Sequence, residues 1–160
     1  MNGRRRSTRR SIGVRFLLDV NVLVALAFPV HALHQRAHAW FRREPDRLWA
    51  TCPLTQAGFL RVACRVFGES SGSAASQSVG NALLALEHDC QSPGHEYWPL
   101  DIDLSDLSNS QRSRLIGANQ VADMQLLMLA NRHRGQLATF DTGIGELATG
   151  TRFANSLLVL

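Results

Sequence analysis

The chain has 160 residues, of which 45% are hydrophobic and 19% charged, so it is long and apolar enough to build the core of one domain. All seventeen basic residues are arginine, which excludes enzymes that need a lysine, such as NTPases with a Walker A loop and Schiff-base enzymes. The net charge of +4 arises in residues 1–13, which hold five arginines and no acid; the remaining twelve arginines face thirteen acids, a balance of −1. The high pI therefore does not indicate a nucleic-acid-binding face on the folded body.

Residues 1–13 are expected to form a disordered basic arm, and residues 14–160 the folded domain. Asp19 and Asn21 interrupt the apolar stretch after the arm, which argues against a secretory signal. The chain has no apolar run of about 18 residues, so no membrane span is expected. The three cysteines are widely spaced and form no Cys-x-x-Cys pair. This pattern indicates reduced, buried thiols and a cytoplasmic location.

The first half of the chain alternates strand and helix patterns. Residues 16–20 form a short apolar run without alternation, which is typical of a strand buried on both faces of a parallel sheet. A helix is expected at 21–27, before Pro29, and a second at 33–43. A strand is expected at 48–51, followed by a helix in whose first turn Pro53 lies.

The second half continues the alternation. We expect a Gly/Ser loop at 70–73, a helix at 74–89, a short edge strand at 97–100 and one short helix within 101–118. A buried helix is expected at 121–133, closed by Gly135, and strands at 137–140 and 157–160. This order predicts an α/β fold with a central, mainly parallel sheet.

Three aspartates lie where such a fold places ligands. Asp19 and Asp141 follow predicted strands, and ligands bind at the carboxyl ends of parallel strands. Asp123 lies in the first turns of the buried helix. Each also has a purely structural explanation. Asp19 could cap the following helix, Asp141 could hold a turn, and Asp123 could complement the amino terminus of its helix. Gathered within ~5 Å they would repel one another by about 3 kcal/mol per pair. Their convergence would therefore require either that one carboxylate stays protonated or that a hard divalent cation, Mg²⁺ or Mn²⁺, neutralises the group.

Four segments resemble the PIN-domain ribonuclease toxins of the VapC type: FLLDVNVL (16–23), CPLTQAGFLR (52–61), VADMQLL (121–127) and LATFD (137–141). The resemblance spans residues 15 to about 147. It implies a three-layer α/β/α PIN-like domain and a Mg²⁺-dependent endoribonuclease that is the toxin of a type II toxin–antitoxin pair. It further implies a VapB-type antitoxin, a homodimer and an RNA substrate, for which transfer RNA is common.

The resemblance also carries roles onto individual residues. Asp19 and Asp123 match the principal metal ligands, and Asp141 matches a third acid of the site. Asn21 matches a position that orients the first aspartate, and Thr139 or Thr142 is expected to support the ligands.

Two residues of the second segment bear on the chemistry. Many PIN nucleases have a glutamate where this chain reads Thr-Gln-Ala, so the neutral Gln56 predicts one well-held Mg²⁺ and weaker binding of a second ion. Gln56 is counted with the catalytic residues. Arg61, expected on the same helix, either binds a phosphate or lies on a solvated face.

His31, His34 and His38 share one helix face and could form a Zn²⁺ or Ni²⁺ site, but a partly exposed face is the better interpretation. Two other functions stay open: a non-catalytic RNA-binding or regulatory PIN module, and a metal-dependent phosphatase.

Overall fold

The structure is a computed structural model that describes residues 13–44, 46–71 and 75–160. Predictions for residues 1–12 and 72–74 lie outside the described residues. Five strands form one sheet in the order β3-β2-β1-β4-β5, and every neighbouring pair is parallel. The predicted parallel sheet is therefore confirmed. The strands are β1 (Arg15–Leu18), β2 (Leu48–Thr51), β3 (His95–Tyr97), β4 (Gln136–Thr139) and β5 (Leu157–Val159).

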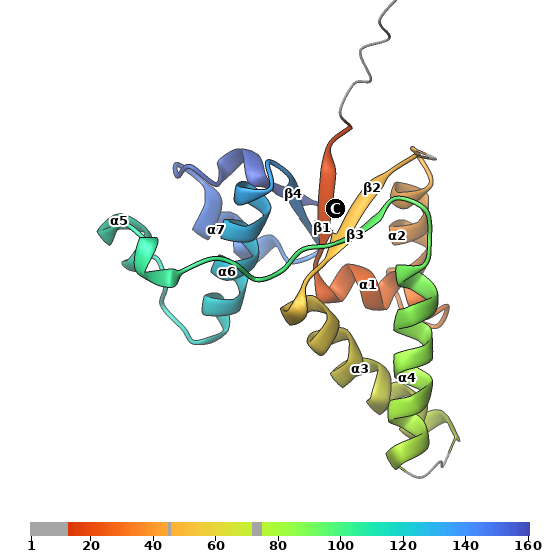
Figure 1. Ribbon diagram of the computed structural model, residues 1–160. Coiled ribbons are helices and arrows are strands. Elements are labelled where there is room, and N and C mark those ends of the chain that lie inside the picture. Colours follow the sequence, from red (N-terminus) through yellow and green to blue (C-terminus); the bar gives the residue numbers. More distant parts are fainter. Residues whose placement is uncertain (1–12, 45, 72–74) are drawn as a thin grey trace, which may run out of the picture.

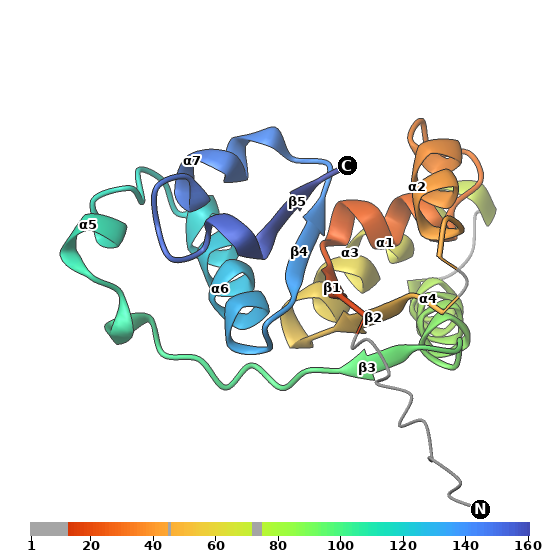
Figure 2. The same ribbon diagram turned by 90° about the horizontal axis from the view of Figure 1, so that it is seen from above.

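Helices cover both faces of this sheet, which confirms the three-layer fold (Figures 1 and 2). One group of helices gathers on one side: α1 (Val20–Ala27), α2 (His34–Phe41), α3 (Pro53–Ser71) and α4 (Ala75–Cys90). The other group lies on the opposite side: α5 (Asn109–Arg112), α6 (Asn119–Arg132) and α7 (Gly145–Ala148). Short 3-10 turns complete the chain at Leu104–Asp106 (η1), Thr142–Ile144 (η2) and Ala154–Ser156 (η3).

The central strand explains the unbroken apolar run of the sequence. Phe16 and Leu18 of β1 join the core under α1 to α4, whereas Leu17 joins the core under α6 and α7. All three side chains are buried. A strand with a core on each face needs apolar residues at every position, not at alternate ones.

The end of α6 corrects a detail of the prediction. Arg134, and not Gly135, takes the left-handed conformation, with φ 53°. The amide of Arg134 donates to Asn131, and that of Gly135 to the carbonyl of Ala130, at 3.0 and 2.9 Å. This pair of bonds is a Schellman motif. Gly135 is required for space, because a Cβ there would lie 2.6 Å from the carbonyl oxygen of Arg15.

Three further expectations are adjusted by the structure. β3 is an edge strand, as predicted, but it begins earlier, and Pro99 follows it. Residues 101–118 hold η1 and α5 in place of one helix. Of the three thiols, only Cys52 is fully buried, while Cys64 and Cys90 are half-buried.

Among the described residues, no helix combines the length and the apolar character that a bilayer span needs.

Candidate functional site

Asp19 stands at the carboxyl end of β1 and begins α1. Its Oδ1 accepts a hydrogen bond from the amide of Val20 at 2.6 Å, which caps the helix. Its Oδ2 accepts from the Thr139 hydroxyl at 2.6 Å and from the Asn21 amide at 2.8 Å. The Asp19 side chain is only 8% exposed. A buried carboxylate with three donors is held in one orientation.

Asn21 and Thr139 join this carboxylate to the next strand. The Asn21 amide also donates to Thr139 Oγ1 at 3.0 Å, and its Oδ1 accepts from the amide of Phe140 at 3.0 Å. The Thr139 hydroxyl accepts a further bond from the amide of Asp141, at 3.0 Å. One donated and two accepted bonds saturate a hydroxyl. The ends of β1 and β4 are thus fixed to each other by side chains, and both expected supporting residues do this work.

Asp123, near the start of α6, faces the same region. Its pKa is raised from 3.8 to about 6, chiefly by burial and also by the negative charges of Asp19 and Asp141. The pKa of Asp19 is also raised, chiefly by burial, although its hydrogen bonds from Thr139 and Val20 oppose the shift. Asp141 is exposed, and its Oδ1 accepts from the amide of Gly143 at 2.7 Å. The three aspartates of the sequence prediction therefore act on one another electrostatically.

This arrangement is open. Within residues 13–44, 46–71 and 75–160, no three His, Cys, Asp or Glu side chains are drawn together into a ready-made metal cage. The three side chains offer carboxylate oxygens, the hard donors that Mg²⁺ and Mn²⁺ prefer. Their donor chemistry suits such an ion, whereas their arrangement in this structure does not form a complete ligand set for it.

In the part of the chain that the structure describes, no hydrogen bond links the other expected residues to these carboxylates. The Gln56 amide donates to Thr51 Oγ1 at 3.0 Å and to Cys90 Sγ at 3.9 Å, and no hydrogen bond links it to the aspartates. Arg61 is exposed on α3, without a described ion pair. Thr142 is exposed at the start of η2. Of the supporting residues named from the resemblance, Asn21 and Thr139 contact Asp19.

The histidine face has a structural explanation. The His34 and His38 rings lie 4.3 Å apart and pair with the carbonyl oxygens of Ala25 and Leu26, at 2.8 and 3.0 Å. These carbonyls end α1 and lack partners within it. His31 accepts from the amide of Leu33 at 3.2 Å. The face therefore joins α2 to α1, as the partly exposed face expected from the sequence.

A cation that sequence reasoning missed lies against Phe140, the residue before Asp141. The guanidinium of Arg36, on α2, is 5.7 Å from the ring centre of Phe140, which connects Thr139 to Asp141. Its Nη2 donates to the carbonyl of Leu160 at 2.7 Å. Nothing local in the sequence signals this position, because only the packing of α2 brings it to the end of β4.

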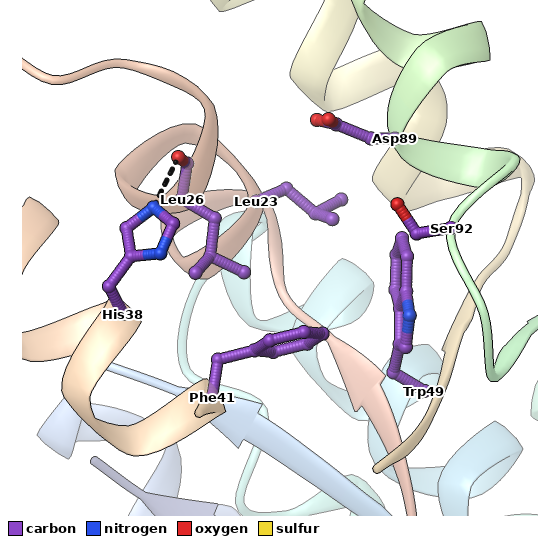
Figure 3. A pocket seen from close by; sticks show the side chains of 7 residues that line it. All are labelled: Leu23, Leu26, His38, Phe41, Trp49, Asp89 and Ser92. Atoms are coloured by element: carbon purple, nitrogen blue, oxygen red, sulfur yellow. Dashed lines mark hydrogen bonds between the residues drawn. The ribbon is translucent and has the colours of Figure 1, made fainter. Parts of the chain in front are cut away.

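An apolar pocket of about 150 Å³ lies elsewhere, between α1, α2, β2 and the end of α4. In Figure 3, Leu23, Leu26, Phe41 and Trp49 point toward the hollow. Of the described residues that line it, Asp89 is the one acid, and none of the three site aspartates is among them. Its lining is therefore unsuited to binding a metal or a phosphate.

Comparison with known proteins places the chain in a family. A model of the PIN domain matches residues 16–150. Ribonuclease VapC44 of Mycobacterium tuberculosis is 40% identical over 135 residues, which are 84% of this chain and 92% of the relative. The chain belongs to the PIN-domain family, among its VapC ribonucleases.

Two other similar proteins agree with this assignment of the PIN domain. Ribonuclease VapC38 of the same organism is 41% identical over 134 residues, 82% of this chain and 89% of the relative. The crystal structure of M. tuberculosis VapC20, described as a toxin that cleaves the sarcin-ricin loop, superposes with a TM-score of 0.54 at 14% identity. It covers 84% of this chain and 95% of that one. At that identity the structure supports the fold alone.

Proposed function

We propose that this PIN domain is a Mg²⁺-dependent endoribonuclease and the toxin of a type II toxin–antitoxin pair in the cytoplasm. The relatives named as VapC ribonucleases support the activity. The observation that carries the proposed metal dependence is the Asp19 carboxylate, which Val20, Asn21 and Thr139 hold at the carboxyl end of β1. Asp123 and Asp141 lie near enough for burial first, and then the negative charges of Asp19 and Asp141, to raise the pKa of Asp123. A VapB-type antitoxin and a homodimer are part of the proposal. Transfer RNA is one substrate to test.

The residues divide the work of phosphodiester hydrolysis. Asp19, Asp123 and Asp141 would hold the divalent cation, which would supply positive charge for the phosphate oxygens and lower the pKa of a water. Thr139 and Asn21 hold the Asp19 carboxylate in place before substrate arrives. No described residue donates a hydrogen bond to Oδ2 of Asp141. This oxygen can therefore accept a proton from the attacking water. Arg36 offers a guanidinium for the phosphate.

A cleavage assay tests the function. The purified protein is incubated with a panel of transfer and ribosomal RNAs in EDTA, and then with excess Mg²⁺ or Mn²⁺. We expect discrete cleavage products only with the added ion, and none from the Asp19→Ala variant. A wild-type protein that binds RNA but cleaves none of the panel with either ion would favour a non-catalytic module. Hydrolysis of a generic phosphomonoester in place of RNA would favour a phosphatase.

The positioning role of Thr139 gives a separate prediction. Thr139→Val removes the hydroxyl that donates to Asp19 and accepts from Asn21 and Asp141. We expect cleavage to fall roughly 10- to 100-fold and the free energy of unfolding to fall by about 1–3 kcal/mol, because buried polar groups lose their partner. Thr139→Ser keeps the hydroxyl and serves as the matched control. Equal activities of the Val and Ser variants would remove Thr139 from the site.

A further inference from the structure

A polar hollow of about 460 Å³ lies on the α5–α7 side of the molecule, outside the carboxylate site. It is formed by the segment around η1 and α5 and by the loop after α7. Both views place α5 and α7 on the same side of the sheet (Figures 1 and 2). Two cations, three hydroxyl side chains and one acid line it: Arg114, Arg152, Ser108, Ser110, Thr151 and Asp106.

The two arginines are held in place without neutralisation. Arg114 Nη1 donates to the carbonyl of Glu146 at 2.7 Å, and the guanidinium of Arg152 lies 5.0 Å from the ring centre of the buried Phe153. Among the described residues, neither forms an ion pair with an acid. Gly150, with φ 70°, adds no side chain beside Arg114, and a Cβ there would lie 3.8 Å from its Nη2. Both cations therefore remain available to a ligand.

The lining chemistry fits a phosphodiester. Guanidinium groups and hydroxyls donate to phosphate oxygens, and here they outnumber the single carboxylate of Asp106. Residues 14–160 carry a net charge of −1, and three of their acids gather at the site. RNA approaching those acids must therefore be attracted by local groups of arginines.

The hollow is connected to the segment that carries Asp141. Arg114 contacts Glu146 of α7, and α7 begins four residues after Asp141. We propose that this hollow binds a backbone phosphate of the RNA substrate, away from the phosphodiester that is cut. The inference rests on the proposed function, because it takes RNA to be the substrate. Arg114 and Arg152 are its phosphate-binding residues.

Binding is measured separately from cleavage. Full-length protein carrying Asp19→Asn, in EDTA, is titrated against a fluorescein-labelled oligouridylate of about 20 nucleotides at several salt concentrations. Arg114→Gln with Arg152→Gln should weaken binding at least about tenfold near 0.1 M salt. It should also lower the slope of log K against log salt by roughly 0.7–1.4, as one or two phosphates lose their cations.

A matched control removes the same two charges elsewhere. Arg43→Gln with Arg65→Gln, both exposed on the α1–α4 side, should leave the slope unchanged and weaken binding less. Ser110→Asp keeps both arginines and adds a negative charge at the hollow. Ser110→Asp should also weaken RNA binding. If circular dichroism shows that the double arginine variant is misfolded, Ser110→Asp becomes the variant that tests the hollow.

Three results would overturn the proposal. The first is an equal loss of RNA affinity in the hollow double variant and in its control double variant. The second is unchanged RNA binding after Ser110→Asp. The third is a hollow variant that loses antitoxin binding while its RNA binding stays intact. The failure of the proposed function looks different. In that case the wild-type protein fails to cleave RNA with Mg²⁺, while the hollow variants still bind RNA more weakly than their controls.

Discussion

Replacing Asp123 with asparagine should strongly reduce RNA cleavage and, in the same protein, raise the melting temperature of the metal-free form. The side chain loses a cation ligand, which should reduce cleavage by roughly three orders of magnitude. Stability should rise because the repulsion from Asp19 and Asp141 disappears. Among the described residues, no hydrogen bond contributes to the shifted pKa of Asp123. The change to asparagine is therefore not expected to remove a stabilising hydrogen bond.

The pH dependence follows from the direction of the shift. The pKa of Asp123 is raised from 3.8 to about 6, so between these values the folded protein keeps a proton that the unfolded chain has released. The free energy of unfolding of the metal-free wild type therefore falls as pH rises through this window. Because Asp123 is partly exposed, we expect a loss of about 1–2 kcal/mol and not the full shift. Above pH 7, Asp123→Asn should melt roughly 2–6 °C higher in EDTA.

Thermal melts in EDTA at several pH values, with and without excess Mg²⁺, measure these effects. The wild type should gain stability when Mg²⁺ is added, and Asp123→Asn should gain much less. Glu87→Gln, on the exposed surface of α4, removes one charge away from the site and should leave both melting and cleavage nearly unchanged. A melting temperature of Asp123→Asn at or below that of the wild type would contradict the convergence of the three acids.

Gly135→Ala should be the most destabilising single-methyl change among the described glycines with negative φ. Its Cβ would lie 2.6 Å from the carbonyl oxygen of Arg15 and 2.9 Å from the ring of Trp98. A backbone oxygen cannot rotate away as a flexible side chain does, so β4 must separate from β1. We expect the free energy of unfolding to fall by about 3 kcal/mol, and cleavage to fall with it because both strands carry site residues.

Gly80→Ala is the matched control for this substitution. Gly80 lies within α4, and nothing approaches the position of its Cβ within 4 Å. Alanine has the higher helix propensity, so stability should rise by about 0.5–1 kcal/mol. Chemical denaturation of the two variants and the wild type measures the difference. If Gly135→Ala proved as stable as the wild type, the close approach of β4 to β1 would be wrong.

Local patterns were enough to predict most of the framework. An apolar run ending in an acid identified β1 and Asp19, and the Pro53 start of α3 is confirmed. These features depend on residues adjacent in sequence. The sequence could also bring Asp19 and Asp141 to one region, because parallel strands end at a common edge. Asp123 lies on a helix, and its place beside them is a hypothesis supported by the family resemblance. Their metal binding stays a prediction.

Other features depend on packing between distant segments. The sequence does not show that Gln56 turns toward Thr51 and Cys90, or that Arg36 reaches Phe140. It also named Gly135 as the residue that closes the helix, whereas Arg134 is the residue that takes the left-handed conformation there. In each case the deciding neighbour lies on another element, where no periodicity signals it.

The hydrogen bonds between Asp19, Asn21 and Thr139 link the activity of this protein to the integrity of its sheet. The bonds that orient the Asp19 carboxylate also connect the end of β1 to the end of β4. A slight spreading of these strands would misalign the acid well before the domain melts. Catalytic rate should therefore report weakening of the scaffold earlier than any spectroscopic signal of unfolding does.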